Sequence, residues 1–378
     1  MRERTRTCWR LILQTCISMS MGLAAFGTSA EPARAEIREA RLSAETIAAR
    51  QHYFGLNNVD PKTGAVRSDR VILSWTGVSG FAAAFNGKVV LMDAYVARDG
   101  GVLIQGNPLG IWPSIKYIGS TPEEMAALKP ELVLLGHTHF DHAGDLPAVI
   151  RANPGLIVAG AAEHCTDIKN TVTDVPFTCI SMFPANAPNG SLTPLYNGII
   201  PGVEFTAIKQ PHSSAPPDPS VDRPFGWNLP NCSADTDYPV GPNEPLAWGA
   251  PNTGPPSGAI SVMWQIRIGN FAIAWQDTAG YIDQSVISSF ASLPKTDVRL
   301  ASVVVAGRNA LALNNAILKP KLFLPLHHDA CGYLIKKDLE DFIASLPDGV
   351  RPTMQFMADP SDYLKPIAFD PHARIWRE

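Results

Sequence analysis

The segment at residues 137–145 has the sequence HTHFDHAGD and directly follows an apolar run at 132–135. It places three imidazoles and two carboxylates within nine positions, and both groups are ligands for divalent metals. A short apolar run of this kind predicts a buried strand, so the polar segment is expected on a loop at the strand's end. Isolated histidines are common, but this density favours a metal centre over a polar loop with coincidental histidines. The chain must therefore fold so that a buried strand opens onto a site for metal ions.

The spacing within the loop suits two neighbouring metal ions. His137 and His139 alternate in an extended segment and can face one ion. Asp141 and His142 lie one turn further on and can face a second ion, which in such sites is about 3.5–4 Å from the first. This is the arrangement that a two-metal hydrolytic site requires.

The loop resembles the H-x-H-x-D-H signature of the metallo-β-lactamase superfamily, and the resemblance extends through most of the chain. The family has a third histidine for the first metal, then a bridging aspartate after a strand, then a last histidine for the second metal. Candidates occur in this order after apolar or alternating segments. The ligand set that the resemblance implies is His137, His139 and His212 for one metal, Asp141, His142 and His327 for the other, and Asp277 between them.

Each of the distant ligands also has a simpler interpretation. His212 lies at the start of a proline-rich stretch and can be a solvated loop histidine. Asp277 precedes a threonine after a predicted strand, which is also an ordinary arrangement for capping a helix. Of the neighbours His327 and His328, strand alternation sends only one toward the metals, and the family's pattern selects His327.

Several nearby polar residues are candidates for supporting the ligands. His328 and Asp329 would contact a ligand or the substrate, because a ligating imidazole usually needs an acceptor for its second nitrogen. Asp145 can play that part or cap the following helix. Residues 74–93 resemble the opening strands of one superfamily branch, which includes ascorbate-phosphate lactonases and N-acylphosphatidylethanolamine phospholipases. In that branch the aspartate that matches Asp93 supports the metal loop from behind.

The hydrophobic pattern predicts hairpin-rich strands, with a tight turn at Asn86 and Gly87 between two of them, followed by strand–helix alternation in each half of the chain. The predicted strands are 71–75, 81–85, 89–92, 132–135, 156–159, 203–209, 260–268, 271–275, 302–306 and 322–326. The predicted helices are 36–50, one beginning after Thr121, 145–151, 161–170, 283–292 and 309–318. This α/β pattern fits the αββα sandwich that the resemblance implies, as a single domain over residues 36–378.

A proline-rich insertion at about residues 211–257 interrupts the alternation and contains four interspersed aromatic residues. Loops of this length are usually functional or disordered. Because the insertion begins at His212, we interpret it as a rigid aromatic lid at the rim of the site, with a purely structural insert as the alternative. It has few aliphatic residues for a core, so we expect replacement of 216–250 to change specificity rather than melting temperature.

The first 35 residues have the features of a secretory signal peptide. A basic segment with four arginines precedes an apolar stretch, and Ala33–Ala35 forms an A-x-A cleavage site. The apolar stretch is short and interrupted by polar residues, which disfavours a membrane anchor. We therefore expect cleavage after Ala35 and a secreted or periplasmic protein with no stable membrane anchor.

The charge balance bears on possible partners. The full chain has 31 basic and 35 acidic residues, and its net charge is −4. Residues 1–35 carry more basic than acidic residues, so the remainder is more acidic still. Since nucleic acid favours a basic surface, we expect a small-molecule or lipid substrate and no nucleic acid. A composition with 46% hydrophobic and 17% charged residues also excludes general disorder.

Four cysteines remain after the signal segment, and they allow one or two disulfides in an oxidising compartment. Pairing of Cys165 with Cys179 is the first choice because it closes the shortest loop. Cys232 and Cys331 are the other two, and sequence alone leaves their pairing open.

The ligand set predicts the chemistry. Two bridged metals would lower the pKa of a shared water to about 7, which supplies a hydroxide nucleophile, and would polarise a carbonyl or phosphoryl oxygen. Zinc suits histidine and carboxylate ligands best, and manganese or iron would also be accepted. We expect Asp141 and Asp277 to be catalytic as well as ligating. The predicted enzyme hydrolyses a lactone, carboxylic ester or phosphodiester.

Other functions on the same scaffold remain as alternatives. An iron-dependent redox enzyme is disfavoured because the diiron branch generally has a glutamate where this chain has His139. A β-lactamase is disfavoured because true β-lactamases of the superfamily lack the bridging carboxylate that Asp277 would provide. A non-catalytic metal-binding module is also disfavoured, since every ligand position is filled.

Overall fold

The structure is a computed structural model, and the described residues belong to one compact unit, Ala40–Glu378. The described ranges are 42–97, 119–196, 198–212, 221–223, 225, 260–278, 284–303, 307–328, 335–357, 362–372 and 375–377. The predicted signal peptide at 1–35 and most of the proline-rich insertion lie outside them. Within these ranges no helix combines the length and apolar character needed to cross a membrane.

Two mixed β-sheets form the centre of the fold. The first contains, in order across the sheet, β15 (Ile375–Arg377), β14 (Pro366–Asp370), β1 (Val71–Gly77), β2 (Gly80–Phe85), β3 (Lys88–Met92), β4 (Leu132–Leu134), β5 (Ile157–Gly160) and β6 (Thr178–Ser181). The second contains β13 (Thr353–Met354), β12 (Leu322–Leu326), β11 (Val298–Ser302), β10 (Phe271–Gln276), β9 (Ile260–Ile268), β8 (Glu204–Pro211) and β7 (Leu192–Pro194).

Each sheet has an antiparallel part and a parallel part. Strands β1 to β3 are antiparallel, and β3 to β6 are parallel. In the second sheet β7 to β10 are antiparallel, and β10 to β13 are parallel. Parallel neighbours bring their carboxyl ends to one sheet edge, which is where the polar loops after β4, β10 and β12 emerge.

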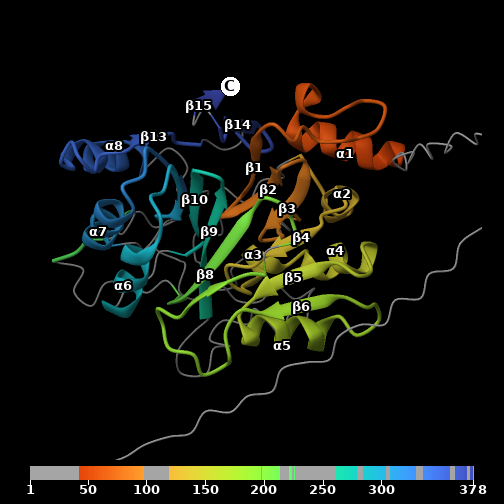
Figure 1. Ribbon diagram of the computed structural model, residues 1–378, viewed down its shortest axis with the longest axis horizontal. Helices are drawn as coiled ribbons and strands as arrows, with labels where there is room; N and C mark the ends of the chain where they lie inside the picture. The colour runs from red at the N-terminus through yellow and green to blue at the C-terminus, as the bar shows by residue number, and fades with distance from the viewer. Residues whose placement is uncertain are drawn as a thin grey trace, which may run out of the picture. The chain divides into compact units, whose positions relative to one another are not determined.

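Helices cover the outer face of each sheet (Figure 1). Those beside the first sheet are α1 (Ala44–Phe54), which the short 3-10 helix η1 (Leu56–Asn58) follows, α2 (Pro122–Ala127), α4 (Leu146–Ala152) and α5 (Ala162–Thr171). Those beside the second are α6 (Gln284–Ser292), α7 (Arg308–Leu318) and α8 (Lys336–Ser345). A further short helix, α3 (Phe140–Ala143), lies within the HTHFDH loop. The predicted αββα sandwich is therefore confirmed.

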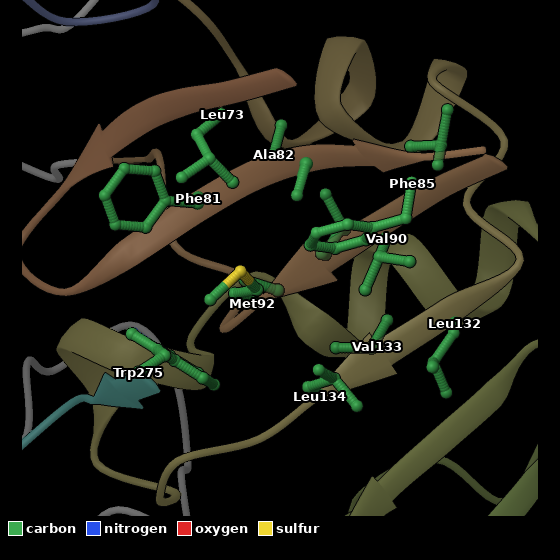
Figure 2. Packing of buried hydrophobic residues seen from close by; sticks show 14 of the residues in the cluster. Leu73, Phe81, Ala82, Phe85, Val90, Met92, Leu132, Val133, Leu134 and Trp275 are labelled. Carbon is green, nitrogen blue, oxygen red and sulfur yellow. The ribbon is translucent and has the colours of Figure 1, made fainter. Parts of the chain in front are cut away.

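The main hydrophobic core contains residues from both sheets. Figure 2 shows side chains of β1 to β4, such as Leu73, Met92 and Val133, in one cluster with Trp275 of the second sheet. Every residue of β1 and β2 is buried, so these strands are covered on both faces. Trp264 and Trp275 are fully buried, and each donates an indole N–H to a backbone carbonyl across the two sheets.

Two local predictions are confirmed in detail. The hydroxyl of Thr121 accepts a hydrogen bond from the backbone N–H of Glu124 at 3.2 Å and caps α2. Asn86 and Gly87 form the turn between β2 and β3 with φ values of 50° and 76°. Asparagine and glycine tolerate this left-handed backbone, which the tight hairpin requires.

Two predicted elements are displaced. The helix predicted at 36–50 is observed at Ala44–Phe54 and so ends four residues later than predicted, and residues 36–41 lie outside the described part of the chain. The strand predicted at 302–306 is observed at Val298–Ser302, and residues 304–306 lie outside the described part of the chain. The buried charge of Arg299 interrupts the apolar pattern of that strand. The pattern therefore predicted the strand a few residues too late, among the more apolar residues that follow.

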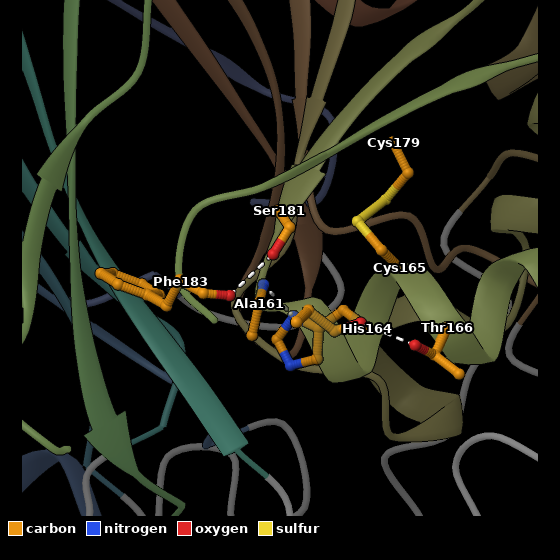
Figure 3. The surroundings of a disulfide bond; sticks show 8 residues. Ala161, His164, Cys165, Thr166, Cys179, Ser181 and Phe183 are labelled. Atoms are coloured by element: carbon orange, nitrogen blue, oxygen red, sulfur yellow. Dashed lines mark hydrogen bonds between the residues drawn. A yellow bond between two sulfur atoms is a disulfide. The ribbon is translucent and has the colours of Figure 1, made fainter. Parts of the chain in front are cut away.

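The predicted disulfide between Cys165 and Cys179 is present and joins α5 to the edge strand β6, with a Cα–Cα distance of 5.6 Å (Figure 3). Cys232 and Cys331 lie outside the described residues.

The described part of the proline-rich insertion corrects one expectation. Phe225 is fully buried, and its ring centroid lies 5.2 Å from that of Phe342 on α8. A carboxylate oxygen of Asp222 accepts a hydrogen bond from the backbone N–H of Asn309 at 2.8 Å, in the first turn of α7. The prediction that 216–250 is dispensable for stability is therefore wrong at these positions. Composition missed the contribution because one aromatic anchor among prolines has no periodic pattern.

Candidate metal centre

Five segments bring their donors to one place at the ends of strands in both sheets. The donors are His137 and His139 in the loop after β4, Asp141 and His142 in α3, His212 after β8, Asp277 after β10, and His327 after β12. All seven residues predicted as metal ligands therefore fall into three overlapping groups of clustered donors.

The first group is His137, His139 and His212, whose potential ligand atoms all lie within 4.8 Å of one another. The three ring centroids are 4.4–4.7 Å apart. The Nε2 atom of His137 lies 3.1 Å from Nδ1 of His139. This cluster matches the ligand set expected for the first metal.

The second group is Asp141, His142 and His327. The Oδ2 atom of Asp141 lies 3.4 Å from Nε2 of His327 and 3.7 Å from Nε2 of His142. The rings of His142 and His327 are stacked with centroids 5.2 Å apart. This cluster matches the set expected for the second metal.

Asp277 lies between the two groups. Its Oδ2 atom contacts Nδ1 of His137 and lies 3.7 Å from Nδ1 of His142. Its second oxygen accepts a hydrogen bond from the hydroxyl of Ser261 at 2.8 Å. Burial raises the pKa of the Asp277 carboxyl to about 7, and the bond from Ser261 opposes this shift. A carboxylate so placed can contact both groups at once.

The cluster contains buried donor atoms that fit bound metal ions. Oδ1 of Asp141 and Nε2 of His142 are buried and have no hydrogen-bond partner among the described residues. Leaving such atoms buried and unsatisfied is costly, and a coordinated cation would satisfy them. Imidazole nitrogen and carboxylate oxygen are also ordinary ligands for zinc and related ions.

The electrostatics of the cluster favour the ligating forms of its residues. Burial and the neighbouring imidazoles hold the pKa of His137 well below its usual value, and burial does the same for His142. Burial alone would raise the pKa of Asp141, but His142 and His327 together hold it below its usual value. Neutral imidazoles and an ionised carboxylate are the forms that bind metal.

Asp93 supports the loop from behind, as the resemblance implied. Its Oδ2 atom accepts a hydrogen bond from Nδ1 of His142 at 2.8 Å, and Oδ1 accepts one from the backbone N–H of Gly136 at 2.9 Å. Since the bond to Asp93 occupies Nδ1, the Nε2 atom of His142 is left facing Asp141.

The neighbours His327 and His328 point in different directions. His327 has φ of 58°, and its backbone N–H donates to the carbonyl of Val78 at 2.9 Å. The Nε2 atom of His328 donates to the carbonyl of Met357 at 2.6 Å, and its ring stacks on Trp75 with centroids 5.4 Å apart. The structure therefore places His327 in the donor cluster, and a left-handed turn after β12, rather than continued strand alternation, separates the pair.

The other predicted supporting residues have different positions. The carboxylate of Asp145 accepts hydrogen bonds from the backbone N–H groups of Val96 and Ala97, at 2.5 and 2.8 Å. Its side chain makes no capping hydrogen bond to α4. Asp145 therefore fixes the backbone of the segment after β3. The other predicted supporting residue, Asp329, lies outside the described residues.

Two residues of the site were missed in the sequence. A Cβ atom added at Gly136 would lie 2.0 Å from the carboxylate of Asp277, so only glycine fits there. Ser261 orients the same carboxylate from β9. The glycine just before the HTHFDH loop was a usable signal for close approach, whereas nothing local distinguishes Ser261.

No family model matches this chain. Among curated proteins, it is 25% identical over 318 residues to a UPF0173 metal-dependent hydrolase of Polynucleobacter asymbioticus, covering 80% of this chain and 88% of the relative. A protein of the same description from Pyrobaculum neutrophilum is 21% identical over 297 residues, covering 78% and 99%.

Solved structures with a similar chain path include Igni18, a metallo hydrolase of the archaeon Ignicoccus hospitalis. It has a TM-score of 0.47 and 15% identity, over 79% of this chain and 98% of that one. An isothiocyanate hydrolase from Delia radicum gut bacteria has a TM-score of 0.44 and 13% identity, over 79% and 99%.

The sequence relatives and the clustered histidine and aspartate donors together define a metal-dependent hydrolase. Its two sheets with flanking helices form the αββα sandwich that the resemblance to the metallo-β-lactamase superfamily implied.

Proposed function

We propose that the protein is a binuclear metallohydrolase in which His137, His139 and His212 hold one metal and Asp141, His142 and His327 hold the other. Asp277 would be the ligand shared by the two metals. The observation that supports this proposal is the meeting of two three-residue donor groups at one buried carboxylate. A single-metal site would leave one of these groups without a metal ion to bind.

Two divalent metals, zinc in the first instance and manganese or iron as alternatives, would supply an activated water and a Lewis acid for the substrate oxygen. The protein's own contribution is positioning. Asp93 fixes the ring of His142, and Ser261 fixes one oxygen of Asp277. Burial of Asp141 and Asp277 excludes bulk water from the carboxylates, which strengthens their interaction with positive charge. No serine or cysteine nucleophile is required.

We further propose that the substrate is a small molecule or lipid with a lactone, carboxylic ester or phosphodiester bond. The bridging carboxylate at Asp277 favours this chemistry over β-lactam hydrolysis, and His139 favours it over diiron redox chemistry. The acidic composition argues against nucleic acid. The signal-like segment at 1–35 and the disulfide between Cys165 and Cys179 support a secreted or periplasmic location.

Metal content tests the proposal before any natural substrate is known. The wild-type protein should bind two metals per chain, measured by elemental analysis after dialysis. Asp277→Ala should bind fewer and lose hydrolysis of generic aryl esters and aryl phosphodiesters, with its circular dichroism spectrum unchanged. Two retained metals with full turnover in this variant would contradict the bridging role.

The matched control is Asp167→Ala. Asp167 is a half-buried carboxylate on α5 that accepts a hydrogen bond from Thr138 of the same loop at 3.4 Å. It belongs to none of the three donor groups. This variant should keep both metals, so an equal loss in the two variants would indicate general damage to the loop. Iron with oxygen consumption, or rapid hydrolysis of a chromogenic cephalosporin, would favour the alternative functions.

A further inference from the structure

Arg299 on β11 is a buried cation outside the donor cluster. Its side chain is 1% exposed, and within the described ranges it forms no ion pair with a carboxylate. Its Nη1 atom donates to the side-chain oxygen of Asn315 at 2.6 Å, and the guanidinium lies 5.5 Å from the ring centroid of Phe323. Burial lowers the pKa of Arg299 to about 9. Burying a cation without a counter-ion is costly, so the other hydrogen bonds of Arg299 must help to offset this cost.

A continuous row of hydrogen bonds joins Arg299 to the metal centre. Its steps are Arg299 Nη2 to Gln276 Oε1 at 3.2 Å, Gln276 Nε2 to Gln210 Oε1 at 3.0 Å, Gln210 Nε2 to Ser261 Oγ at 3.2 Å, and Ser261 Oγ to Asp277 Oδ1 at 2.8 Å. All five side chains are at most 3% exposed. We call this row the Arg299 relay.

The guanidinium sets the direction of the bonds in the relay, and the backbone carbonyl of Thr278, which accepts from Nε2 of Gln210 at 3.3 Å, supports the same orientation of Gln210. Because arginine has only donors, the amide of Gln276 must turn its oxygen toward Arg299. Its NH₂ group then faces the oxygen of Gln210, whose NH₂ group faces Ser261. The single hydroxyl proton of Ser261 is left for Asp277. Bonds that all point the same way also polarise one another in a buried environment.

The sheet explains why these distant residues meet. The relay crosses β8, β9, β10 and β11, which are neighbouring strands, and Gln210 and Ser261 are paired in the register of β8 and β9. The helix-facing side of these strands is covered by an apolar cluster that includes Val286 and Phe290 of α6 and Leu318 of α7. This layer helps to keep water from competing for the relay's hydrogen bonds.

We propose that Arg299 is a positioning residue for the metal centre: through the relay it keeps Oδ1 of Asp277 bonded to Ser261, so that Oδ2 faces His137 and His142. The inference rests on the proposed bridging role of Asp277. No proton is transferred along the relay. Its effect is to fix the orientation of the carboxylate that the two donor groups share.

Gln276→Glu is the sharpest test because it separates stability from metal binding. The new carboxylate is a counter-ion for Arg299 but has no donor for Gln210. The oxygen of Gln210 would face that carboxylate unfavourably, so we expect the amide to give up its bond to the carbonyl of Thr278 and to turn its NH₂ group toward residue 276. Its oxygen then faces Ser261 and takes the hydroxyl proton away from Asp277. We expect an equal or higher melting temperature, with roughly ten- to hundred-fold weaker binding of one metal.

Two measurements are needed on the purified full-length protein. Competition with a chromogenic chelator gives the zinc affinity of each site. The visible absorption spectrum of the cobalt-substituted protein reports the ligand geometry, so a shifted spectrum is expected for Gln276→Glu. Unchanged zinc affinity and an unchanged cobalt spectrum would overturn the inference.

Matched variants separate the relay from general damage. Gln265 lies four residues from Ser261 on the same face of β9, is 3% exposed, and donates to the carbonyl of Pro294 at 3.0 Å. Gln265→Met should keep wild-type metal affinity, whereas Gln276→Met should lose it. Equal affinities in these two variants would overturn the relay.

If the substitutions at Gln276 prevent folding, Ser261→Ala decides the question with a smaller change. It should weaken one metal site, and wild-type affinity in this variant would overturn the inference. Failure of the proposed function has a different signature. Wild-type protein without a second metal would remove the bridging role of Asp277, whereas two metals in wild type with unaffected relay variants would remove only the relay.

Discussion

Acidification should destabilise the protein through His164, a buried histidine on α5. Its Nδ1 atom accepts a hydrogen bond from the backbone N–H of Ala161 at 3.1 Å, and Nε2 donates to the carbonyl of Ile260 at 2.8 Å. Both contacts require the neutral ring with its proton on Nε2. Burial lowers the pKa of His164 to about 4, compared with an ordinary value of 6.5.

The sign and size of the effect follow from this shift. Between pH 6.5 and pH 4 the unfolded chain binds a proton at this histidine and the folded chain does not, so stability falls as the pH falls. Above pH 6.5 the stabilisation is fully present. At pH 5 the loss from His164 is about 2 kcal/mol, and it reaches a limit of about 3 kcal/mol below pH 4.

The assay compares denaturant unfolding of metal-free wild type and His164→Gln at pH 7.5 and pH 5.0. Other titrating groups are common to both proteins, so their contributions largely cancel. Stability of wild type should fall between the two pH values by about 2 kcal/mol more than that of the variant. The same fall in both proteins would refute the reasoning, because it would mean that His164 does not remain neutral in the folded state.

Four further substitutions test the site and its surroundings. Asp93→Asn should weaken metal binding roughly ten- to hundred-fold in chelator competition, because asparagine has a single acceptor oxygen and cannot accept from both His142 Nδ1 and the backbone N–H of Gly136; unchanged affinity would contradict this. His327→Ala should lose a metal by elemental analysis while His328→Ala keeps both, and the opposite result would show that the assignment of the pair is reversed. Phe225→Ala should cost about 3–5 kcal/mol in denaturant unfolding, whereas unchanged stability would mean that its contacts with α8 are unimportant.

The sequence permitted prediction wherever the signal was local. The HTHFDH loop after an apolar strand indicated the metal centre, because ligand types and spacing within a few residues carry the chemistry. The turn at Asn86 and Gly87 and the cap at Thr121 were predictable for the same reason. The pairing of Cys165 with Cys179 followed from loop length. The strand Val298–Ser302 was misplaced because the buried Arg299 interrupts its apolar pattern.

The three distant donors could be predicted only in part from the sequence. His212, Asp277 and His327 were identified from their order and from a family resemblance, but their chemistry alone left simpler interpretations open. The structure brings each one to the same cluster because β8, β10 and β12 all end there. The turn that separates His327 from His328 is a left-handed backbone conformation, which strand alternation does not predict.

The sequence by itself determined which types of metal donor are present and that four of them lie on a loop at the end of a strand. Both features depend only on neighbouring residues. Only the tertiary structure decided which remote side chains contact them. Gly136 lies against Asp277, Phe225 fills a site beside α8, and Arg299 reaches Asp277 through three other side chains. These contacts join strands and helices that are far apart in the chain. Their partners are selected by sheet register and packing, and neither leaves a periodic pattern in the sequence.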